Sequence, residues 1–420
     1  MEILSTGEKI KRARVYQGIT LKELCSDKVS ISKMSCIENG KIKADNDILK
    51  YVSNKLNIDY NYLTRDVKEQ IIANIKSIDN NLIDEEEIEK LLNNNLNYSI
   101  EYSYFDLAFE LTHKLFRFYI KENKVENIQV IISKYYDLYQ KNNTTENTIT
   151  YFEDMAIFSY SIKEYNEAIS YYQRIKNIIS ENDNIDKQKF SYASYYEGKA
   201  YEKLKEIEKA FTSIKDAFKY IDNVKEDLYR GKIFHAYASL SIRLNKKDYN
   251  KYMNEAYSYL KNYPMALAIA KRKNSESFFY INEKEKAIEE IKKGIELFPV
   301  DNKKEMVRFL NKCIKTLYNN EEYDYAYEIT DDALNYAITI NDIVQMEESY
   351  YLKGMILQKM KLYSQAETYM NFSLDALFKF SNKEKKYERY LELGDMYHNL
   401  GEVKDSLKYF SLAMKMEREK

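Results

Sequence analysis

A motif that returns about every forty residues constrains this chain more than any other feature of its sequence. The segments 195–218, 350–374 and 390–414 share a glycine, a small residue twelve positions later and a bulky residue four positions beyond that. These residues are Gly198, Ala210 and Ile214, then Gly354, Ala366 and Met370, then Gly394, Ser406 and Phe410. Small residues at this spacing predict pairs of helices that cross at close range, because larger side chains would separate them.

Weaker copies of the motif extend the repeat along most of the chain. The second small position recurs near residues 168, 210, 250, 287, 326, 366 and 406, and an earlier copy is expected over 104–140. The 420 residues include only 9 Gly and 2 Pro, so few residues interrupt helices. The sequence therefore predicts an all-α protein whose larger part is a right-handed α-solenoid of helix pairs.

The first 66 residues show a different pattern, in which five short helices replace the long repeat. Capping-box sequences at 5–8 and 20–23 predict the starts of two helices, and Gly18 and Gly40 predict helix ends. The remaining helices are expected over about 28–40, 46–56 and 59–63. The predicted core residues of this segment are Ile10, Leu21, Leu24, Val29, Met34, Ile37, Leu49, Val52, Leu56 and Leu63.

The third of these short helices has an unusually polar outer face. When its apolar residues point inward, that face carries Ser32, Lys33, Ser35 and Cys36. Hydroxyls and a lysine can hydrogen-bond base edges in the major groove, while flanking lysines contact phosphates. Residues 1–66 contain 12 Lys or Arg against 9 Asp or Glu, whereas the remainder contains 53 against 58. The segment therefore predicts a helix-turn-helix DNA-binding domain, with a small helical docking domain as the alternative interpretation.

Residues 10–42 resemble the phage-repressor-type (Cro/C1, XRE) helix-turn-helix family. The matching positions are Arg14, Gly18, Leu24, Cys25, Val29, Ser30 and the run 37–41. The resemblance implies a pair between Arg14 and Glu38, which joins the first and third helices. It implies DNA contacts from Thr20, Leu21, Ile31, Ser32, Lys33, Ser35, Cys36, Asn39, Lys41 and Lys43. Most members have a glycine in the turn and one more residue before the glutamate, so the register of base contacts stays open by about one position.

The forty-residue motif resembles tetratricopeptide repeats, whose usual period is about 34 residues. The first helices of such repeats line a concave wall that commonly holds peptides. First-helix positions projected onto that wall are Tyr195, His235, Arg272, Arg308, Asn311, Lys315, Tyr351 and Gln358. Asn and Gln can hold a peptide backbone and Arg can bind a terminal carboxylate, although the same residues could simply line a solvated groove. The expected domains are thus a head over 1–66, a helical connector over 67–97 and a repeat domain over 98–420.

A DNA-binding head joined to a peptide-binding repeat body resembles the RRNPP family of quorum-sensing transcriptional regulators. The resemblance implies a cytoplasmic homodimer that binds double-stranded DNA and a short signalling peptide. A second function stays open, in which the repeats hold a folded protein such as a sporulation phosphorelay component and DNA binding is secondary.

Catalytic, metal and membrane functions find little support in the sequence. It contains no Gly-rich phosphate loop and no nucleophile elbow, so we expect neither an enzyme nor a cofactor. The three histidines, His113, His235 and His398, lie on different predicted helices, so they do not indicate a metal site. The three cysteines show no spacing typical of disulfide pairs, which favours a reducing compartment. No apolar run approaches the roughly 20 residues that a membrane-spanning helix needs.

Overall fold

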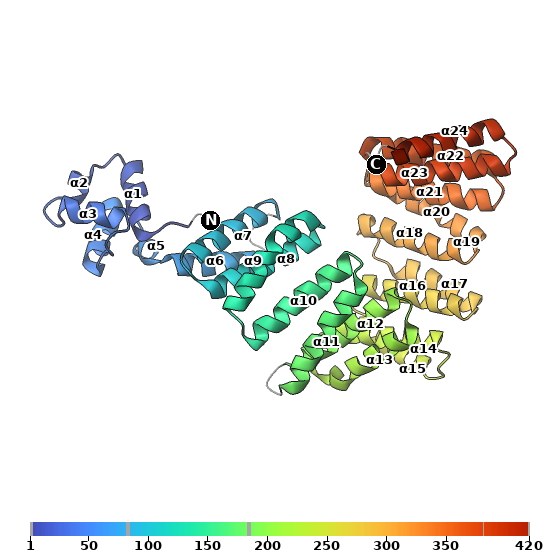
Figure 1. The fold of residues 1–420 in the computed structure, drawn as a ribbon, viewed down its shortest axis with the longest axis horizontal. Helices are drawn as coiled ribbons and strands as arrows, with labels where there is room; N and C mark the ends of the chain where they lie inside the picture. The colour runs from blue at the N-terminus through green and yellow to red at the C-terminus, as the bar shows by residue number, and fades with distance from the viewer. Residues whose placement is uncertain (1–2, 81–84, 183–185, 381, 419–420) are drawn as a thin grey trace. The chain divides into compact units, whose positions relative to one another are not determined.

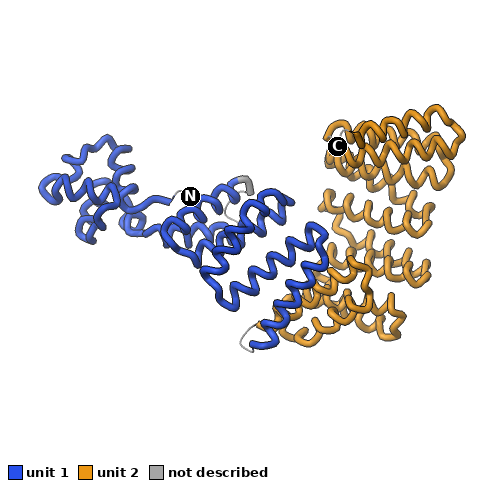
Figure 2. Tube along the Cα trace, in the orientation of Figure 1, with its two compact units in different colours: residues 1–185 blue, residues 186–420 orange. Residues whose placement is uncertain are grey.

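The structure is a computed structural model that describes residues 3–80, 85–182, 186–380 and 382–418. Within these ranges every regular element is a helix, as the scarcity of helix breakers predicts. The chain divides into two compact units, residues 1–185 and 186–420, which Figure 2 distinguishes by colour. The fold is therefore all-α, and each unit is described separately below.

Unit 1 begins with the five short helices expected in the first 66 residues. They are α1 (Thr6–Tyr16), α2 (Leu21–Cys25), α3 (Ile31–Glu38), α4 (Asn46–Leu56) and α5 (Tyr60–Thr64). Ser5 and Thr20 form the two predicted capping boxes with Glu8 and Glu23. Gly40 has a φ of 72°, in the left-handed region that glycine adopts without steric cost, and α3 ends just before it.

A separate hydrophobic core holds these five helices together. Its fully buried members are Ile10, Leu24, Cys25, Met34, Ile37, Ile48, Leu49, Val52, Leu56 and Leu63, and the predicted core residues Leu21 and Val29 pack against them half-buried. Lys9 is buried with its ammonium group bonded to the carbonyl oxygens of Tyr62 (2.8 Å) and Arg65 (2.5 Å). This lysine ties α1 to the end of α5, where the head joins the next helix.

The rest of unit 1 is built from longer helices. They are α6 (Val67–Asp79), α7 (Glu85–Glu101), α8 (Phe105–Lys121), α9 (Val125–Lys141), α10 (Thr145–Ser161) and α11 (Tyr165–Glu181). The copy of the motif expected over 104–140 corresponds to the hairpin α8/α9. The expected connector at 67–97 contains α6 and most of α7, but residues 81–84 lie outside the described residues. Because α7 continues to Glu101 and packs against α8, it forms part of the helical stack.

Unit 2 is a succession of helical hairpins. Its helices are α12 (Lys187–Lys203), α13 (Ile207–Ala217) with the 3-10 helix η1 (Phe218–Asn223), α14 (Asp227–Arg243), α15 (Tyr249–Leu260), α16 (Pro264–Tyr280), α17 (Lys284–Leu297), α18 (Lys303–Asn319), α19 (Tyr323–Glu328), α20 (Thr330–Thr339), α21 (Ile343–Lys359), α22 (Tyr363–Phe380), α23 (Lys383–Asn399) and α24 (Val403–Arg418). The first helices α14, α16, α18 and α21 contact one another in that order (Figure 1). These four helices thus form one row within the unit, as in a tetratricopeptide-like solenoid.

The predicted close crossings occur at the aligned glycines. A β-carbon placed on Gly198 would lie 2.7 Å from Ile214 Cδ1, and one on Gly394 would lie 2.7 Å from the ring of Phe410. At Gly354 the corresponding atoms belong to Met370, at 2.9 Å. These distances are shorter than ordinary van der Waals contact, so only glycine fits without rearrangement.

The copy predicted around residues 238–250 is the exception. A hairpin is present there, but Asn250 is exposed at the start of α15 and is no crossing residue. The close approach lies instead at Gly231, where an added β-carbon would be 2.6 Å from Leu260 Cγ. The prediction of a small crossing residue near 250 is therefore wrong, because the connection between α14 and α15 is longer than in the aligned hairpins.

The crossings predict unequal effects of the same substitution. Gly394→Ala should lower the urea midpoint more than Gly354→Ala, because the ring of Phe410 is rigid whereas Met370 has flexible torsions. We expect Gly394→Ala to cost about 1–3 kcal/mol in unfolding free energy. Equal midpoints for the two variants would show that the crossings do not limit helix separation.

Candidate functional site

The outer face of α3 is open in the structure. Ile31, Ser32 and Lys33 are exposed at its N-terminus, and Ser35 and Cys36 are half-buried. The side chain of Ser30 caps the helix by accepting a hydrogen bond from the Lys33 amide at 3.2 Å. Beyond α3 the predicted contacts Asn39, Lys41 and Lys43 are also exposed. The predicted α3 contacts therefore share one accessible region of the head.

At the N-terminus of α2, where the resemblance implies phosphate contacts, the side chains already form hydrogen bonds with each other. Glu23 accepts hydrogen bonds from both the amide and the hydroxyl of Thr20, each at 2.7 Å. These bonds lower the pKa of Glu23, the backbone bond contributing most, so the carboxylate is charged. Leu21 packs half-buried against the core. A phosphate at this helix end would have to approach the Glu23 charge.

Arg14 and Glu38 form a bidentate ion pair between α1 and α3. Arg14 Nε lies 2.7 Å from Glu38 Oε1, and its terminal nitrogen lies 2.9 Å from Oε2. The Arg14 guanidinium also donates to the carbonyl oxygen of Ile19 at 3.0 Å, in the turn before α2. Glu38 is only 4% exposed, and its hydrogen bond raises the pKa of Arg14. The pair fixes α3 relative to α1 and leaves neither side chain free to contact DNA.

Lys33 has an acidic partner in this structure. Its ammonium group lies 3.2 Å from Asp45 Oδ2, and both side chains are largely exposed. Asp45 is also the N-cap of α4, where its other oxygen accepts from the Ile48 amide at 2.9 Å. An exposed pair of this kind contributes at most about 1 kcal/mol, so Lys33 can exchange Asp45 for another anion.

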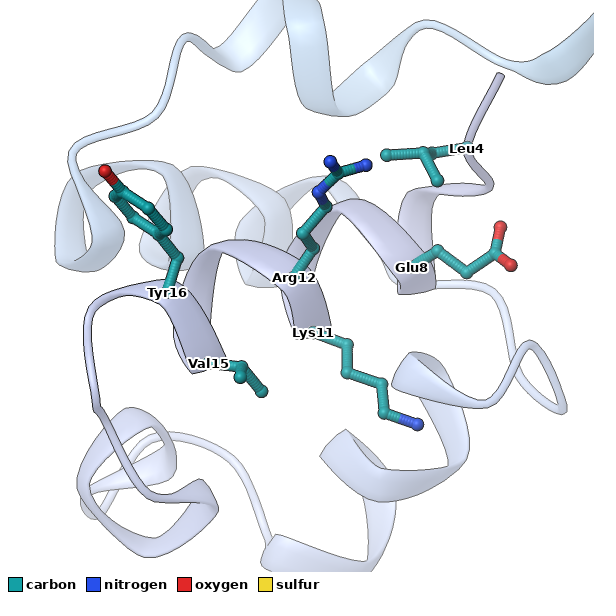
Figure 3. Close-up of a pocket in the computed structure, with 6 residues that line it drawn as sticks. All are labelled: Leu4, Glu8, Lys11, Arg12, Val15 and Tyr16. Atoms are coloured by element: carbon teal, nitrogen blue, oxygen red, sulfur yellow. The ribbon is translucent and has the colours of Figure 1, made fainter. Parts of the chain in front are cut away.

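A hollow on the head lies apart from α3. Figure 3 shows the six side chains that line it, all from α1 and the segment just before it: Leu4, Glu8, Lys11, Arg12, Val15 and Tyr16. Tyr16 is 92% exposed and Val15 is 61% exposed. Because neither α2 nor α3 supplies a lining residue, this hollow is separate from the predicted DNA contacts.

The predicted peptide contacts all lie on first helices of unit 2, but their exposure differs. Tyr195, His235, Arg272 and Asn311 are each at least nine-tenths buried, and Tyr351 and Gln358 are half-buried. Arg308 and Lys315 are exposed and form ion pairs with Glu305 and Glu348. The structure therefore places seven of these residues on the row formed by α14, α16, α18 and α21, and Tyr195 on α12, without bringing all eight to one accessible surface.

Several of the buried residues connect neighbouring first helices. His235 Nε2 lies 2.9 Å from the carbonyl oxygen of Ala270, and Ser349 donates to Asn311 Oδ1 at 3.1 Å. Burial, with the charges of Lys273 and Lys199, lowers the pKa of His235 to about 3. His235 is thus a neutral packing residue at physiological pH.

The sequence interpretation missed a group of basic residues on the same helices. Lys199, Arg243 and Lys273 come from α12, α14 and α16 and are partly buried. Burial lowers the pKa of each, and neighbouring cations lower those of the two lysines further. The only signal in the sequence was a Lys or Arg in the second half of each of these helices, which does not follow the period of the small residues.

The described part of the chain contains neither a cluster of metal-ligating side chains nor a membrane-spanning helix. Nowhere in residues 3–80, 85–182, 186–380 or 382–418 do three His, Cys, Asp or Glu side chains gather as metal ligands would. Within those same ranges, no helix is both long enough and apolar enough to cross a membrane.

No family model matches the chain, and no curated protein matches it either. Solved structures with a similar fold include the apo form of the quorum sensor NprR from B. thuringiensis, at 16% identity and a TM-score of 0.46, covering 84% of this chain and all of that one. Aspartyl phosphate phosphatase F from Bacillus subtilis matches at 14% identity and a TM-score of 0.41, covering 99% of this chain and 96% of that one. A signal transduction ATPase with numerous domains that carries a tetratricopeptide repeat sensor, from Pyrococcus horikoshii, matches at 14% identity and a TM-score of 0.45, covering 79% of this chain and 53% of that one. At these identities and scores the likenesses do not identify a function.

The buried cations predict a pH-dependent stability. The pKa of Lys273 falls to about 8, chiefly through burial and then through Arg272, from an ordinary value of 10.5. Between these two pH values the unfolded chain binds more protons than the folded one, so stability rises with pH across the window. Below pH 8 the Lys273 side chain is charged in both the folded and the unfolded state, and its burial then lowers the free energy of unfolding by the full amount of the pKa shift.

Lys273→Met should therefore stabilise the protein at pH 7 by on the order of 1–3 kcal/mol and reduce the gain in stability between pH 7 and 9.5. Urea unfolding at both pH values measures this. Lys293→Met, which alters an exposed lysine on α17 of the same hairpin, is the control. A Lys273→Met variant that is less stable at pH 7 would contradict the burial argument.

Proposed function

We propose that the chain is a sequence-specific DNA-binding transcriptional regulator controlled by a short peptide bound to the first helices of its repeats. The observation that carries the proposal is the polar face of α3, exposed and held on a packed core by the Arg14–Glu38 pair. A rigid helix with accessible short polar side chains and a lysine suits the major groove.

The peptide part of the proposal rests on polar groups buried in the row of first helices. Asn311 Nδ2, Gln358 Nε2 and Arg272 Nε are enclosed and form no hydrogen bond with the protein. An unsatisfied buried donor costs roughly 1–3 kcal/mol, which a ligand that supplies acceptors would offset. Backbone carbonyl oxygens of an extended peptide are acceptors of this kind.

The two parts act together if the protein is a homodimer whose heads contact two half-sites. A peptide then regulates DNA binding only if it binds one dimer arrangement more tightly than the other, each tenfold preference being worth about 1.4 kcal/mol. Resemblance to the RRNPP family, in particular to clostridial RstA-like regulators, suggests sporulation or toxin genes as targets.

Selection from random duplex DNA with the purified full-length protein tests the proposal. We expect an inverted repeat whose half-site spacing reflects two heads separated by whole helical turns. Selection should be repeated in the presence of a pool of short synthetic peptides, since a protein that needs its peptide for DNA binding would enrich no DNA sequence without it. Failure to enrich any sequence under both conditions would favour the alternative function, binding of a folded phosphorelay-type partner by the repeats.

The Lys33–Asp45 pair predicts that substitutions of its two residues change the affinity for DNA in opposite directions. Lys33→Ala should weaken specific DNA binding by roughly 1–3 kcal/mol if Lys33 contacts a base. Asp45→Asn should strengthen binding, because it frees Lys33 and removes a carboxylate near phosphates while an asparagine still caps α4. Lys55→Ala, at an exposed position near the end of α4, serves as the control.

Binding curves at several salt concentrations separate the possible roles of Lys33. A lower salt slope with unchanged sequence preference would make it a phosphate contact. If both Lys33→Ala and Asp45→Asn left affinity and slope unchanged, α3 would not be the DNA-contacting helix.

A further inference from the structure

The segment just before α1 packs outside the head. Ile3 is 2% exposed and belongs to the hydrophobic core formed by α6–α10 of unit 1, which we call the body core. That core also contains Val67 and Ile71 of α6, whereas the buried residues of the head core lie between Ile10 and Leu63. The chain therefore contacts the body core with an apolar side chain before the head begins.

The next residue, Leu4, is bonded to α6 through both of its backbone groups. Its amide donates to Gln70 Oε1 at 3.2 Å, and its carbonyl oxygen accepts a hydrogen bond from Gln70 Nε2 at 2.8 Å. A carboxamide carries an acceptor and two donors on one planar group, so a single glutamine can satisfy both backbone groups of one residue. Gln70 thus attaches Leu4, which Figure 3 shows just before α1, to α6 at two points.

Ser5 joins this segment to α1 without slack. Its side chain accepts from the Glu8 amide at 3.3 Å, and its amide donates to the Glu8 carboxylate at 2.7 Å, which closes the capping box of α1. We call residues 3–5 the strap, since they contact the body core, α6 and α1 in turn. Two residue steps span at most about 7 Å, so the start of α1 stays close to α6 while Ile3 and Leu4 remain in place.

The covalent connection between the head and α6 is held by the same glutamine. The carbonyl oxygen of Arg65 accepts from Lys9 Nζ of α1 at 2.5 Å and from Gln70 Nε2 of α6 at 3.2 Å. Gln70 also donates to the carbonyl oxygen of Asp66 at 3.1 Å. A head attached through this connection alone could rotate about its backbone dihedrals. The strap adds a second attachment at the start of α1, which removes that rotation.

Helix α6 is in turn bonded to the helices that follow it. The buried Asn74 side chain donates to Asn95 Oδ1 of α7 at 3.0 Å. Lys68 of α6 lies 3.5 Å from Asp106 of α8, and its ammonium group lies 5.5 Å from the ring centre of Tyr104. A displacement of α7 or α8 is therefore transmitted to α6.

We propose that the strap fixes the head on α6, so that the head and α6–α8 turn as one body and a rearrangement of the repeats reorients α3. The attachment of the head is independent of the proposed function, but the effect on α3 rests on it. Two heads with fixed orientations match one half-site spacing, because each added base pair rotates a half-site by about 35°. Heads that can rotate freely match several spacings.

Trypsin treatment of the full-length protein tests the attachment. Arg65 is exposed, and the bond after it can enter a protease only when its carbonyl oxygen leaves Lys9 and Gln70. Gln70→Glu keeps the shape of the side chain but removes the donor for the carbonyl oxygens, and Ile3→Ser weakens burial in the body core. Both variants should be cleaved after Arg65 about tenfold faster than the parent protein.

A matched control lies inside the head. Gln17 Nε2 donates to the carbonyl oxygen of Leu56 at 2.6 Å, so Gln17→Ala removes a comparable bond without touching the strap. This variant should change cleavage after Arg65 less than about twofold. Lys50 and Lys55 are exposed on α4, and cleavage there reports unfolding of the head. Unchanged cleavage after Arg65 in both strap variants, or equal acceleration at all three sites, would overturn the attachment.

DNA binding tests the second half of the proposal. On duplexes selected by the parent protein, a change of one or two base pairs between half-sites should weaken parent binding about tenfold and weaken Gln70→Glu binding less than about threefold. A Gln70→Glu variant that is cleaved faster after Arg65 but keeps the spacing preference of the parent would overturn the reorientation of α3 alone. If the parent protein selects no DNA, the proposed function and the reorientation both fail, whereas the trypsin result still decides the attachment.

Discussion

The repeat part of the structure depends on close contact between paired helices at positions that lack a side chain. At Gly198 and Gly394 the backbone of one helix lies directly against a bulky side chain of the next, and an added β-carbon would overlap it. Close approach of this kind maximises dispersion contacts and excludes voids, so it sets the distance between the paired helices. Regular pairs can stack, and stacking places the first helices of unit 2 in one row.

That row buries several polar and charged side chains, among them His235, Arg272, Asn311 and Glu347. Where they are buried, most are matched: Glu347 accepts hydrogen bonds from Arg389, Lys385 and Ser373, and Arg389 is the largest influence that lowers its pKa against the opposing effect of burial. Matched groups of this kind specify which helices meet, because a buried charge without its partner is strongly destabilising.

In the head, one buried pair and one exposed pair have different roles. Arg14–Glu38 is enclosed and two-pronged, and removal of one member of such a pair typically costs about 3–5 kcal/mol. Lys33–Asp45 is exposed and contributes far less, so it can open when phosphate approaches. The head therefore combines a fixed orientation of α3 with a lysine that remains exchangeable.

Local signals in the sequence determined the helices, the capping boxes and the close crossings, because each depends on residues near one another in the chain, and the spacing of apolar residues within each short helix indicated the head core. The missed crossing near residue 250 shows the limit: the loop before α15 is longer, and periodicity alone does not record loop geometry. Side-chain environment was predicted less well. Tyr195, His235 and Asn311 were placed on the correct helices, but the structure buries them. Lys199, Arg243 and Lys273 gave no periodic signal, yet the fold brings them together. The sequence by itself thus determined an all-α chain of crossing helix pairs behind a small helical head. Only the tertiary structure decided which charges share a low-dielectric surface, because that depends on the stacking of hairpins about forty residues apart.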